Sequence, residues 1–381
     1  MTIKRTIKTG FTIISIIAVL LFLQKYVVKP WGSNDIRIKG FYMEPENTLD
    51  LVIVGSSETY NAFSPCQAYA EYGIFSYPFS SAQSSAATWK TQIDEIMRTQ
   101  SPDLIVVEVN GILYRDEPAY LEGDLRLFTN NMPVNHNMEE LIDCYAEHLV
   151  ADTRMSYYLP YIKYHTNILP PEKAARRMED RISLESRSYT YLKGGNMILK
   201  VMEPDEVMDL SGDTGKTELG PEYEEIFRDF LEHCRKNEYP VLFIRAPHCI
   251  RKGDGKNIDR FHMVNRVQEI VREYGFDLIN FDTMHNEIGI DEKTDFSSSE
   301  HLNIYGQRKF TSYFTGLLLD RHFIREKAKE KEDLDKWEIC RKYYEAWYRD
   351  SLNEKDDSDE EEGEYRYETA KLMKKLSKEI L

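Results

Sequence analysis

The strongest constraint on the fold is the stretch Leu49 to Val54, apolar apart from Asp50, which stops abruptly at Gly55-Ser56-Ser57. A continuous apolar, β-branched run of this length indicates a strand that is buried on both faces, as in a parallel sheet. The glycine and serines after it indicate the turn at the carboxyl end of the strand. Because open α/β sheets bind ligands at that end of their strands, Ser57 is a candidate nucleophile.

Helix-like and strand-like segments alternate after this stretch. They are a helix at Pro65–Tyr72, a strand at Phe75–Phe79, a helix at Ala86–Gln100 and a strand at Leu104–Val109. Strands that alternate with helices predict a parallel sheet with right-handed crossovers. Ser57, the Ser80–Ser85 turn and Asn110 should therefore lie along one edge of the sheet.

The same alternation resumes after residue 220. It comprises helices at Pro221–Lys236 and Ile258–Tyr274, strands at Pro240–Ile244 and Phe276–Phe281, and a loop from Asp295 that leads into a helix ending near Leu319. Residues 114–220, with helices at Met138–Leu149 and Pro171–Leu184, are interpreted as a cap or insertion over the sheet edge. We therefore predict an α/β domain over residues 36–320, built as a three-layer α/β/α sandwich around a central, mainly parallel sheet.

Residues 1–30 contain an apolar segment, from Gly10 to Leu23, preceded by Lys4, Arg5 and Lys8. Extended to Val28, it is long enough to cross a bilayer as one helix. A cleaved signal peptide is the alternative, but no small-x-small cleavage site follows the apolar run, which favours an uncleaved anchor. The basic residues before it favour a single-pass protein in the cell membrane whose remaining chain is extracytoplasmic.

The overall charge and the cysteines exclude several classes of function. A formal net charge of −16 argues against nucleic acid as a partner, since phosphate binding requires a basic face. Five cysteines without Cys-x-x-Cys spacing suggest neither a zinc site nor a disulfide framework, and we expect no metal or cofactor. Residues 321–381 form a charged tail with a helix-like part to Tyr348, an acidic run at Asp356–Glu364 and a last amphipathic helix at Tyr367–Leu381, which either packs back or binds a partner.

A serine hydroxyl becomes a strong nucleophile when a histidine, oriented by an acid, takes its proton. His301 is the best candidate for this base, because it lies in the loop after the last strand and would return to the edge that carries Ser57. The backbone N–H of Ser57, the Ser81–Gln83 turn and the Asn110 side chain could form the oxyanion hole, with Gln83 as the donor in the turn.

Each of these residues also has a simpler interpretation. Ser56 and Ser57 could cap a helix, and Asn110-Gly111 could be an ordinary turn. His301 could be a surface histidine, as could the three others named here, His248, His262 and His285. The order of the motifs and their places at strand ends favour the catalytic interpretation.

At these residues the chain resembles the SGNH/GDSL hydrolase superfamily. Gly55-Ser56-Ser57-Glu58 is similar to its Gly-Asp-Ser block, Asn110 matches its oxyanion asparagine, and Asp295–Lys309 is similar to its last block, although Glu108 replaces a glycine. The resemblance covers residues 36–320 and is closest to membrane-anchored members, including the D-alanyl transfer protein of teichoic acid modification and alginate-type O-acetyltransferases. In that subset an insert often carries a Tyr-His pair and a Lys-Gly segment, as at Tyr164-His165 and Lys193-Gly194.

The position of the family's acid, three residues before the histidine, holds Ser298. Asp295 is the first candidate to replace it, Glu300 is the second, and a dyad of Ser57 and His301 without an acid is the third. The loss of the orienting acid can cost about 10⁴-fold in rate in a serine protease.

Three functions from different classes fit these observations. The first is an extracytoplasmic serine esterase or O-acyltransferase that acts on an acylated cell-envelope glycan or a small acyl ester. The second is a catalytically impaired relative that binds glycan or a membrane acyltransferase. The third is a phosphate-binding module, which lacks the support of a Gly-Lys-Ser/Thr motif.

Overall fold

The computed structural model describes residues 3–28, 36–149, 154–175, 191–204, 206–325 and 327–353. The chain forms two compact units, one from Met1–Ile36 with Tyr120–Ser188 and the other from Arg37–Ala119 with Tyr189–Leu381. These boundaries differ from those expected from the sequence. Much of the predicted 114–220 insertion groups with the N-terminal helix, and the C-terminal helix groups with the sheet.

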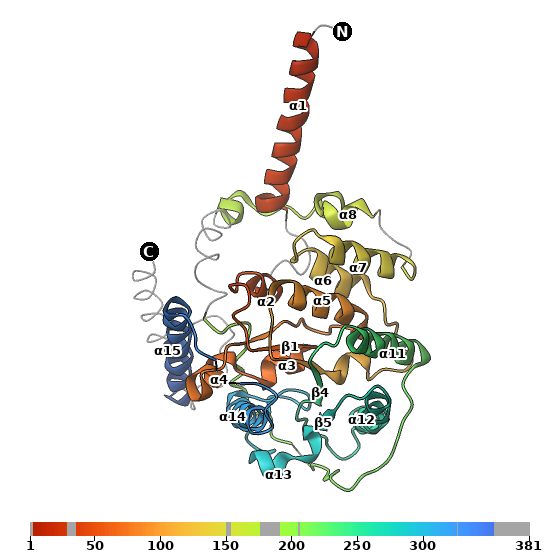
Figure 1. The fold of residues 1–381 in the computed structure, drawn as a ribbon, viewed down its shortest axis with the longest axis vertical. Helices are drawn as coiled ribbons and strands as arrows, with labels where there is room; N and C mark the ends of the chain where they lie inside the picture. Colours follow the sequence, from red (N-terminus) through yellow and green to blue (C-terminus); the bar gives the residue numbers. More distant parts are fainter. Residues whose placement is uncertain are drawn as a thin grey trace. The chain divides into compact units, whose positions relative to one another are not determined.

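The second unit contains a five-stranded parallel sheet, which confirms the α/β prediction (Figure 1). Its strands are β1 (Leu51–Val54), β2 (Ser76–Pro78), β3 (Leu104–Glu108), β4 (Val241–Arg245) and β5 (Leu278–Asn280). Their order is β2-β1-β3-β4-β5, and every neighbouring pair is parallel. The chain therefore adds β2 on one side of β1 and β3 on the other, which makes the carboxyl ends of β1 and β3 a topological switch point.

The central strands are apolar because both of their faces are covered. On one face, Leu51 and Ile53 belong to a buried cluster with Phe63, which directly follows α3, and Phe314, on α14. On the other face the ring of Phe243 packs edge-on against Phe227 at 5.6 Å and Phe230 at 6.3 Å, both on α11. A strand buried on both sides needs apolar residues at every position, which explains the uninterrupted runs in the sequence.

The helices of this unit largely follow the predicted ranges. They are α2 (Ile36–Phe41), α3 (Ser57–Ala62), α4 (Pro65–Tyr72), α5 (Trp89–Thr99), α11 (Pro221–Lys236), α12 (Gly255–Glu273), α13 (His285–Ile288), α14 (Ile304–Asp320) and α15 (Lys331–Asn353). The short 3₁₀ turns are η2 (Ala86–Thr88), η3 (Val109–Ile112) and η4 (Phe281–Thr283). The helices α4 and α11 have the bounds expected from their first-turn prolines. The helix α3, which begins at Ser57, was not predicted.

The helix α15 is part of the domain, although its sequence reads as a charged tail. The ring of Trp337 stacks on Phe75 at 4.6 Å and is 2% exposed. The Tyr344 hydroxyl donates to the Oε1 atom of Gln67 on α4 at 2.8 Å. Burial of these aromatic side chains therefore packs α15 onto the domain, although charged residues lie between them in the sequence. The predicted acidic run at 356–364 and the helix at 367–381 lie outside the described residues.

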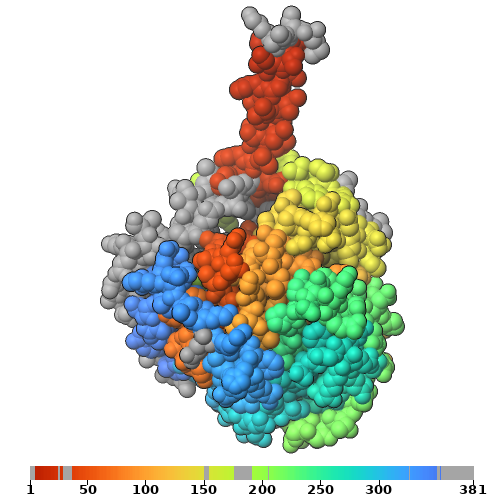
Figure 2. Space-filling model, in the orientation of Figure 1, coloured from red at the N-terminus to blue at the C-terminus, as the bar shows by residue number. Residues whose placement is uncertain are grey.

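The first unit begins with α1 (Ile3–Phe22) and the π-helical turn η1 (Leu23–Val27). The window Arg5–Phe22 is long and apolar enough to span a membrane, and none of it is buried. In Figure 2 this helix is the red column, with the yellow and lime residues of its own unit at its foot. The unit also contains α6 (Glu122–Thr129), α7 (His136–Ala146), α8 (Met155–Tyr158) and α9 (Tyr161–Tyr164). Of the helix predicted at 171–184, residues 176–184 lie outside the described residues.

Candidate active site

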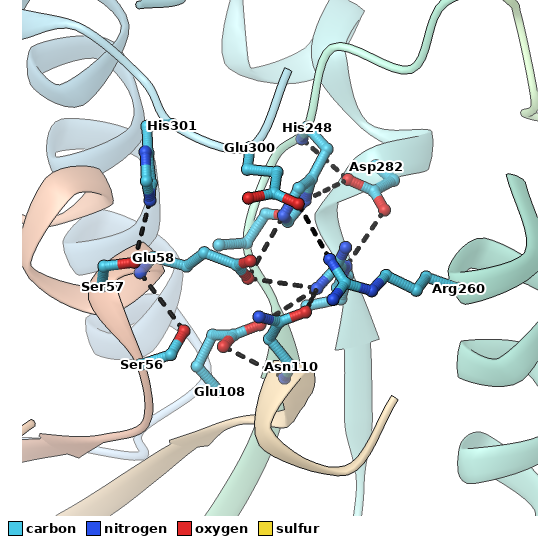
Figure 3. A network of polar contacts seen from close by, with 12 residues as sticks. Ser56, Ser57, Glu58, Glu108, Asn110, His248, Arg260, Asp282, Glu300 and His301 are labelled. Carbon is cyan, nitrogen blue, oxygen red and sulfur yellow. Dashed lines mark hydrogen bonds and ion pairs between the residues drawn. The ribbon is translucent and has the colours of Figure 1, made fainter. Parts of the chain in front are cut away.

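Ser57 lies directly beyond β1 as the first residue of α3, and its hydroxyl meets the imidazole of His301 (Figure 3). The Ser57 Oγ atom is 2.9 Å from the His301 Nε2 atom. Ser56 is the N-cap of the helix, and its Oγ atom accepts from the N–H of Glu58 at 3.4 Å. The capping interpretation thus applies to Ser56, while Ser57 is left to contact the histidine.

Gly55 allows this sharp exit from β1. Its φ of +147° lies in a region that favours glycine, and a Cβ atom there would be 3.1 Å from the carbonyl oxygen of Glu108 and 2.8 Å from a methyl group of Thr59. The glycine therefore lets β1 turn into α3 at close contact with the end of β3. This close contact places the serine beside the residues that follow β3.

His301 is presented by a loop that is held firmly at both ends. Phe296 and Leu302 form an antiparallel bridge, and the Asn303 side chain caps α14 by accepting from two backbone N–H groups. Burial lowers the pKa of His301 below its ordinary value. The ring is therefore neutral at pH 7, which a general base requires.

The other ring nitrogen of His301 faces Ser298. The Ser298 Oγ atom is 3.4 Å from Nδ1 and also accepts from the backbone N–H of Glu300 at 3.3 Å and of His301 at 3.1 Å. A hydroxyl oxygen has two lone pairs, and both face these N–H groups, so its proton is the one available to Nδ1. This arrangement favours the tautomer with the proton on Nε2, whereas general-base catalysis needs Nε2 free.

Neither carboxylate proposed as the acid contacts the ring. Asp295 is 1% exposed and its Oδ2 atom accepts from Lys309 at 2.6 Å and from the N–H of Asp291 at 2.8 Å. Glu300 pairs with Arg260 at 2.9 Å. Among the described residues the partner of His301 Nδ1 is thus a hydroxyl. Asp295 lies too early in the loop to orient the ring and instead ties the loop to α14.

Asn110, in the turn η3 after β3, has a fixed amide orientation. Its Oδ1 atom accepts from the Nη1 atom of Arg245 at 3.1 Å. Because a guanidinium group only donates, this contact assigns the oxygen to the arginine side and leaves the Nδ2 atom as a donor. Glu108 caps the same turn by accepting from the Asn110 N–H at 3.1 Å, and so helps to hold the asparagine in place.

The turn after β2 approaches the same edge of the sheet. The Thr59 hydroxyl donates to Ser80 at 2.6 Å, and a Cβ atom on Gly111 would be 2.8 Å from the carbonyl oxygen of Ser84. Gln83 lies in this turn with an exposed side chain and a φ of 57°. The structure thus brings the turn beside Asn110 and α3, and the role of Gln83 as an oxyanion donor stays a prediction.

Behind the asparagine lies a buried network of charges that the sequence analysis missed (Figure 3). Arg245 contacts Glu58 at 3.1 Å and Asp282 at 3.4 Å. His248 pairs with the same two carboxylates, at 3.2 Å from Glu58 and 3.0 Å from Asp282. Each of these four side chains is at most 2% exposed. A signal was present, because Arg245 is the last residue of β4 and His248 lies three residues beyond it.

The protonation states in this network balance its charge. Burial opposes the ionisation of Glu58, but His248 and Arg245 lower its pKa to about 2. Burial and Arg245 act against the charge of His248, yet Glu58 and Asp282 raise its pKa to about 9. Burial, reinforced by Glu58, raises the pKa of Glu108 well above its ordinary value. Two cations therefore face the carboxylates of Glu58 and Asp282, and the raised pKa of Glu108 favours its neutral form.

The Tyr164-His165 and Lys193-Gly194 segments have structural partners. The Lys193 ammonium group donates to both carboxylate oxygens of Glu44 at 2.8 Å and lies 4.7 Å from the ring of Trp337. Tyr164 is buried in the first unit near Arg126, and His165 is exposed there. The structure does not show either segment in contact with Ser57 or His301.

Comparison of the chain with protein-family models gives no match, and comparison with curated proteins gives no significant match. Within the described ranges, no group of three or more His, Cys, Asp or Glu side chains is arranged to hold a metal ion. The function must therefore be inferred from the geometry of the site.

Proposed function

We propose that the protein is a serine esterase or O-acyltransferase of the SGNH type, with the three-layer α/β/α arrangement of that superfamily. The observation that carries the proposal is the 2.9 Å contact between Ser57 Oγ and His301 Nε2 at the carboxyl edge of a parallel sheet. Chain order also supports it, because the serine follows β1, the asparagine follows β3 and the histidine precedes α14. A helix cap, a turn and a surface histidine could each explain one of these residues. Separate roles of this kind do not explain why all three lie at the same edge of the sheet.

In the proposed reaction, the Ser57 Oγ atom attacks the carbonyl carbon of an acyl ester while His301 Nε2 takes its proton. The negative charge on the carbonyl oxygen is stabilised by the N–H of Ser57, the Nδ2 group of Asn110 and the turn at Gln83. The leaving alcohol takes the proton from His301. Water or a sugar hydroxyl then attacks the acyl carbon and gives its proton to His301. The ester bond to Ser57 breaks and His301 returns a proton to Ser57 Oγ, which completes hydrolysis or transfer.

The proposed substrate is an acyl group, with acetyl as the first candidate, on a polysaccharide of the cell envelope. This proposal rests on α1, which is long and apolar enough to anchor the chain in a membrane, and on the basic residues at its start. In the proposed topology both units beyond α1 are extracytoplasmic. Proteolysis of intact cells tests it, since protection of the sheet unit would contradict it.

A second candidate function is supported by the Ser298 hydroxyl at 3.4 Å from Nδ1 of His301. A hydroxyl donor there favours the unproductive tautomer and leaves an imidazolium without a carboxylate partner. The protein would then be a catalytically impaired relative that binds acylated glycan or a membrane acyltransferase.

A fluorophosphonate probe, which phosphonylates an activated serine, distinguishes the two functions. We expect the probe to label the full chain and to leave Ser57→Ala unlabelled. Ser56→Ala is the matched control, because it removes a neighbouring hydroxyl and costs about 1 kcal/mol of capping without touching the nucleophile. Label that persists in Ser57→Ala contradicts the proposed nucleophile, and a folded protein that is never labelled favours the impaired relative.

A further inference from the structure

The segment 154–169 of the first unit, which we name the juxtamembrane segment, is joined to the end of the apolar helix α1. It contains α8 and α9 and crosses the foot of α1 in Figure 1. One side-chain contact and two backbone contacts make the connection: Tyr161 N–H donates to Gln24 Oε1 at 3.4 Å, Leu169 N–H donates to the Val27 carbonyl at 2.9 Å, and Val28 and Ile168 form an antiparallel bridge. The position of the segment along the axis of α1 is thereby fixed.

These contacts determine a depth in the bilayer if α1 spans it, as the proposed topology requires. The apolar window ends at Phe22, and Gln24 and Val27 are two and five residues beyond it. At about 1.5 Å per helical residue they lie roughly 3 and 8 Å past the end of the window. The polar region on each side of the hydrocarbon core is about 5–8 Å thick. The juxtamembrane segment therefore lies at the depth of the lipid headgroups.

The segment has an inner side that packs on its own unit. The guanidinium of Arg126, on α6, lies 3.7 Å from the ring centre of Tyr157 and 5.8 Å from that of Tyr164. The same guanidinium donates to the carbonyl oxygen of Ser156 at 2.7 Å and to its hydroxyl at 2.6 Å. Arg126 thus holds the segment in one orientation.

The outer side of the segment carries three exposed apolar side chains, beside the exposed polar residues Arg154, His165, Thr166 and Asn167. Met155 is 54% exposed, Ile162 43% and Ile168 58%. Tyr158 and Tyr161 are half-buried between the two sides, and tyrosine is enriched at membrane interfaces. Apolar side chains that are held outward at headgroup depth meet the boundary between headgroups and acyl chains, which is where interfacial segments dock.

The arginine and the lysine of the segment are already paired with carboxylates of their own unit. Lys163 pairs with Glu122, and Arg154 pairs with Asp143. Binding to this surface should therefore depend on apolar burial and not on anionic lipid.

We propose that Met155, Ile162 and Ile168 form a second membrane contact, which docks the juxtamembrane segment into the interface of the bilayer that α1 spans. The contact would hold the first unit against the membrane surface, whereas α1 alone attaches it at one point. The proposal rests on the membrane anchor of the proposed function, and not on catalysis by Ser57.

The test uses the full chain reconstituted in phosphatidylcholine vesicles, with Ile162→Trp compared with Val201→Trp. The control has nearly the same exposure, 42% against 43%, but belongs to the sheet unit. With lipid brominated near the carbonyl end of its acyl chains, we expect Ile162→Trp to lose about half of its added fluorescence, since docked residues lie roughly 5–10 Å deep. Val201→Trp should keep its fluorescence, and anionic lipid should not increase the quenching of Ile162→Trp.

Flotation of the same vesicles separates failure of the docking surface from failure of the anchor. Protein that floats but shows no quenching at position 162, or equal quenching at both positions, overturns the docking proposal and leaves α1 as the anchor. An absence of quenching at position 162 would indicate that the apolar surface contacts a membrane protein partner instead of lipid. Protein that does not float overturns the anchor and the docking surface together. Labelling of Ser57 by the probe reports the proposed chemistry independently.

Discussion

The Nη1 atom of Arg245 donates to the Oδ1 atom of Asn110 at 3.1 Å, and both lie at the carboxyl end of the sheet. An asparagine amide can face either way, and this contact selects the orientation in which Nδ2 is a donor. The buried charges thus connect to the proposed oxyanion hole through this hydrogen bond and through the one that Glu108 accepts from the Asn110 N–H. His301 is held by its loop, so the two halves of the site are oriented by separate parts of the chain.

Replacement of Asn110 by alanine should slow acylation of Ser57. A lost oxyanion donor costs about 10²–10³-fold in rate, so we expect that decrease in the rate of fluorophosphonate labelling for Asn110→Ala. Asn257→Ala is the control, because Asn257 is equally polar and buried but caps α12 with Asp254. Equal labelling rates in the two variants would remove Asn110 from the oxyanion hole.

Arg245→Met should destabilise the fold strongly. The substitution leaves Glu58 and Asp282 facing a single buried cation, and the loss of one partner from a buried ion pair costs about 3–5 kcal/mol. The free energy of unfolding, measured by denaturant titration of the detergent-solubilised chain, reports this loss. The double variant Arg245→Met/Glu58→Gln should recover part of it, because one carboxylate is neutralised as well. Additive losses would show that the two groups are not coupled.

The sequence predicted the sheet because its strands are buried on both faces and are therefore uniformly apolar. It also predicted the meeting of Ser57, His301 and Asn110 at the carboxyl edge, since chain order and parallel topology together bring strand ends to one edge. The network around Arg245 was missed because its charges come from three strand ends and a helix start. Their pairing depends on strand order, which local patterns do not specify.

Two other predictions show where local patterns fail. Asp295 was placed near the histidine by sequence distance, but a loop can turn its side chains either way, and Lys309 attracts this carboxylate instead. Residues 321–348 were assigned to a charged tail outside the domain, although apolar and aromatic residues recur there at helical spacing. In the structure Trp337 contacts Tyr69 of α4 and stacks on Phe75, and Tyr344 belongs to a buried cluster with Cys66 of α4.

Trp337→Ala should show that α15 stabilises the sheet unit. Trp337 stacks on Phe75, and truncation of a buried aromatic side chain costs about 3–5 kcal/mol. Leu352→Ala, on the same helix but 42% exposed, should change stability by less than about 0.5 kcal/mol. Thermal unfolding of the two variants measures the difference, and similar midpoints would mean that α15 is not part of the cooperative unit.

Stability should fall as pH rises above neutrality because of His248. Its pKa of about 9 in the folded protein exceeds its ordinary value of 6.5, so its stabilising effect is complete below pH 6.5 and is lost as pH rises through 9. The change corresponds to roughly 3 kcal/mol. Glu58 acts in the opposite direction, and its contribution disappears as pH falls from 4.5 through about 2. In Glu58→Gln the alkaline decline should shift to lower pH, and an unchanged profile would exclude His248 as its source.

Ser298→Asp should convert the site to a full triad and increase its activity. In the native protein the Ser298 hydroxyl, 3.4 Å from Nδ1, favours the proton on Nε2. A carboxylate accepts from Nδ1–H, frees Nε2 to take the proton of Ser57, and stabilises the imidazolium that forms. We expect the labelling rate to increase by no more than about 10⁴-fold, which is the factor that an orienting acid supplies in serine proteases.

The pH profile distinguishes this gain from a nonspecific effect of charge. Burial lowers the pKa of His301 in the native protein, and a carboxylate beside Nδ1 should raise it. Labelling requires the neutral ring, so the rise of its rate with pH should move to higher pH in Ser298→Asp. Ser298→Asn, which has the same shape without the charge, should show neither the gain nor the shift. Equal labelling rates and pH profiles in Ser298→Asp and Ser298→Asn would show that the missing acid does not limit the activity of the site.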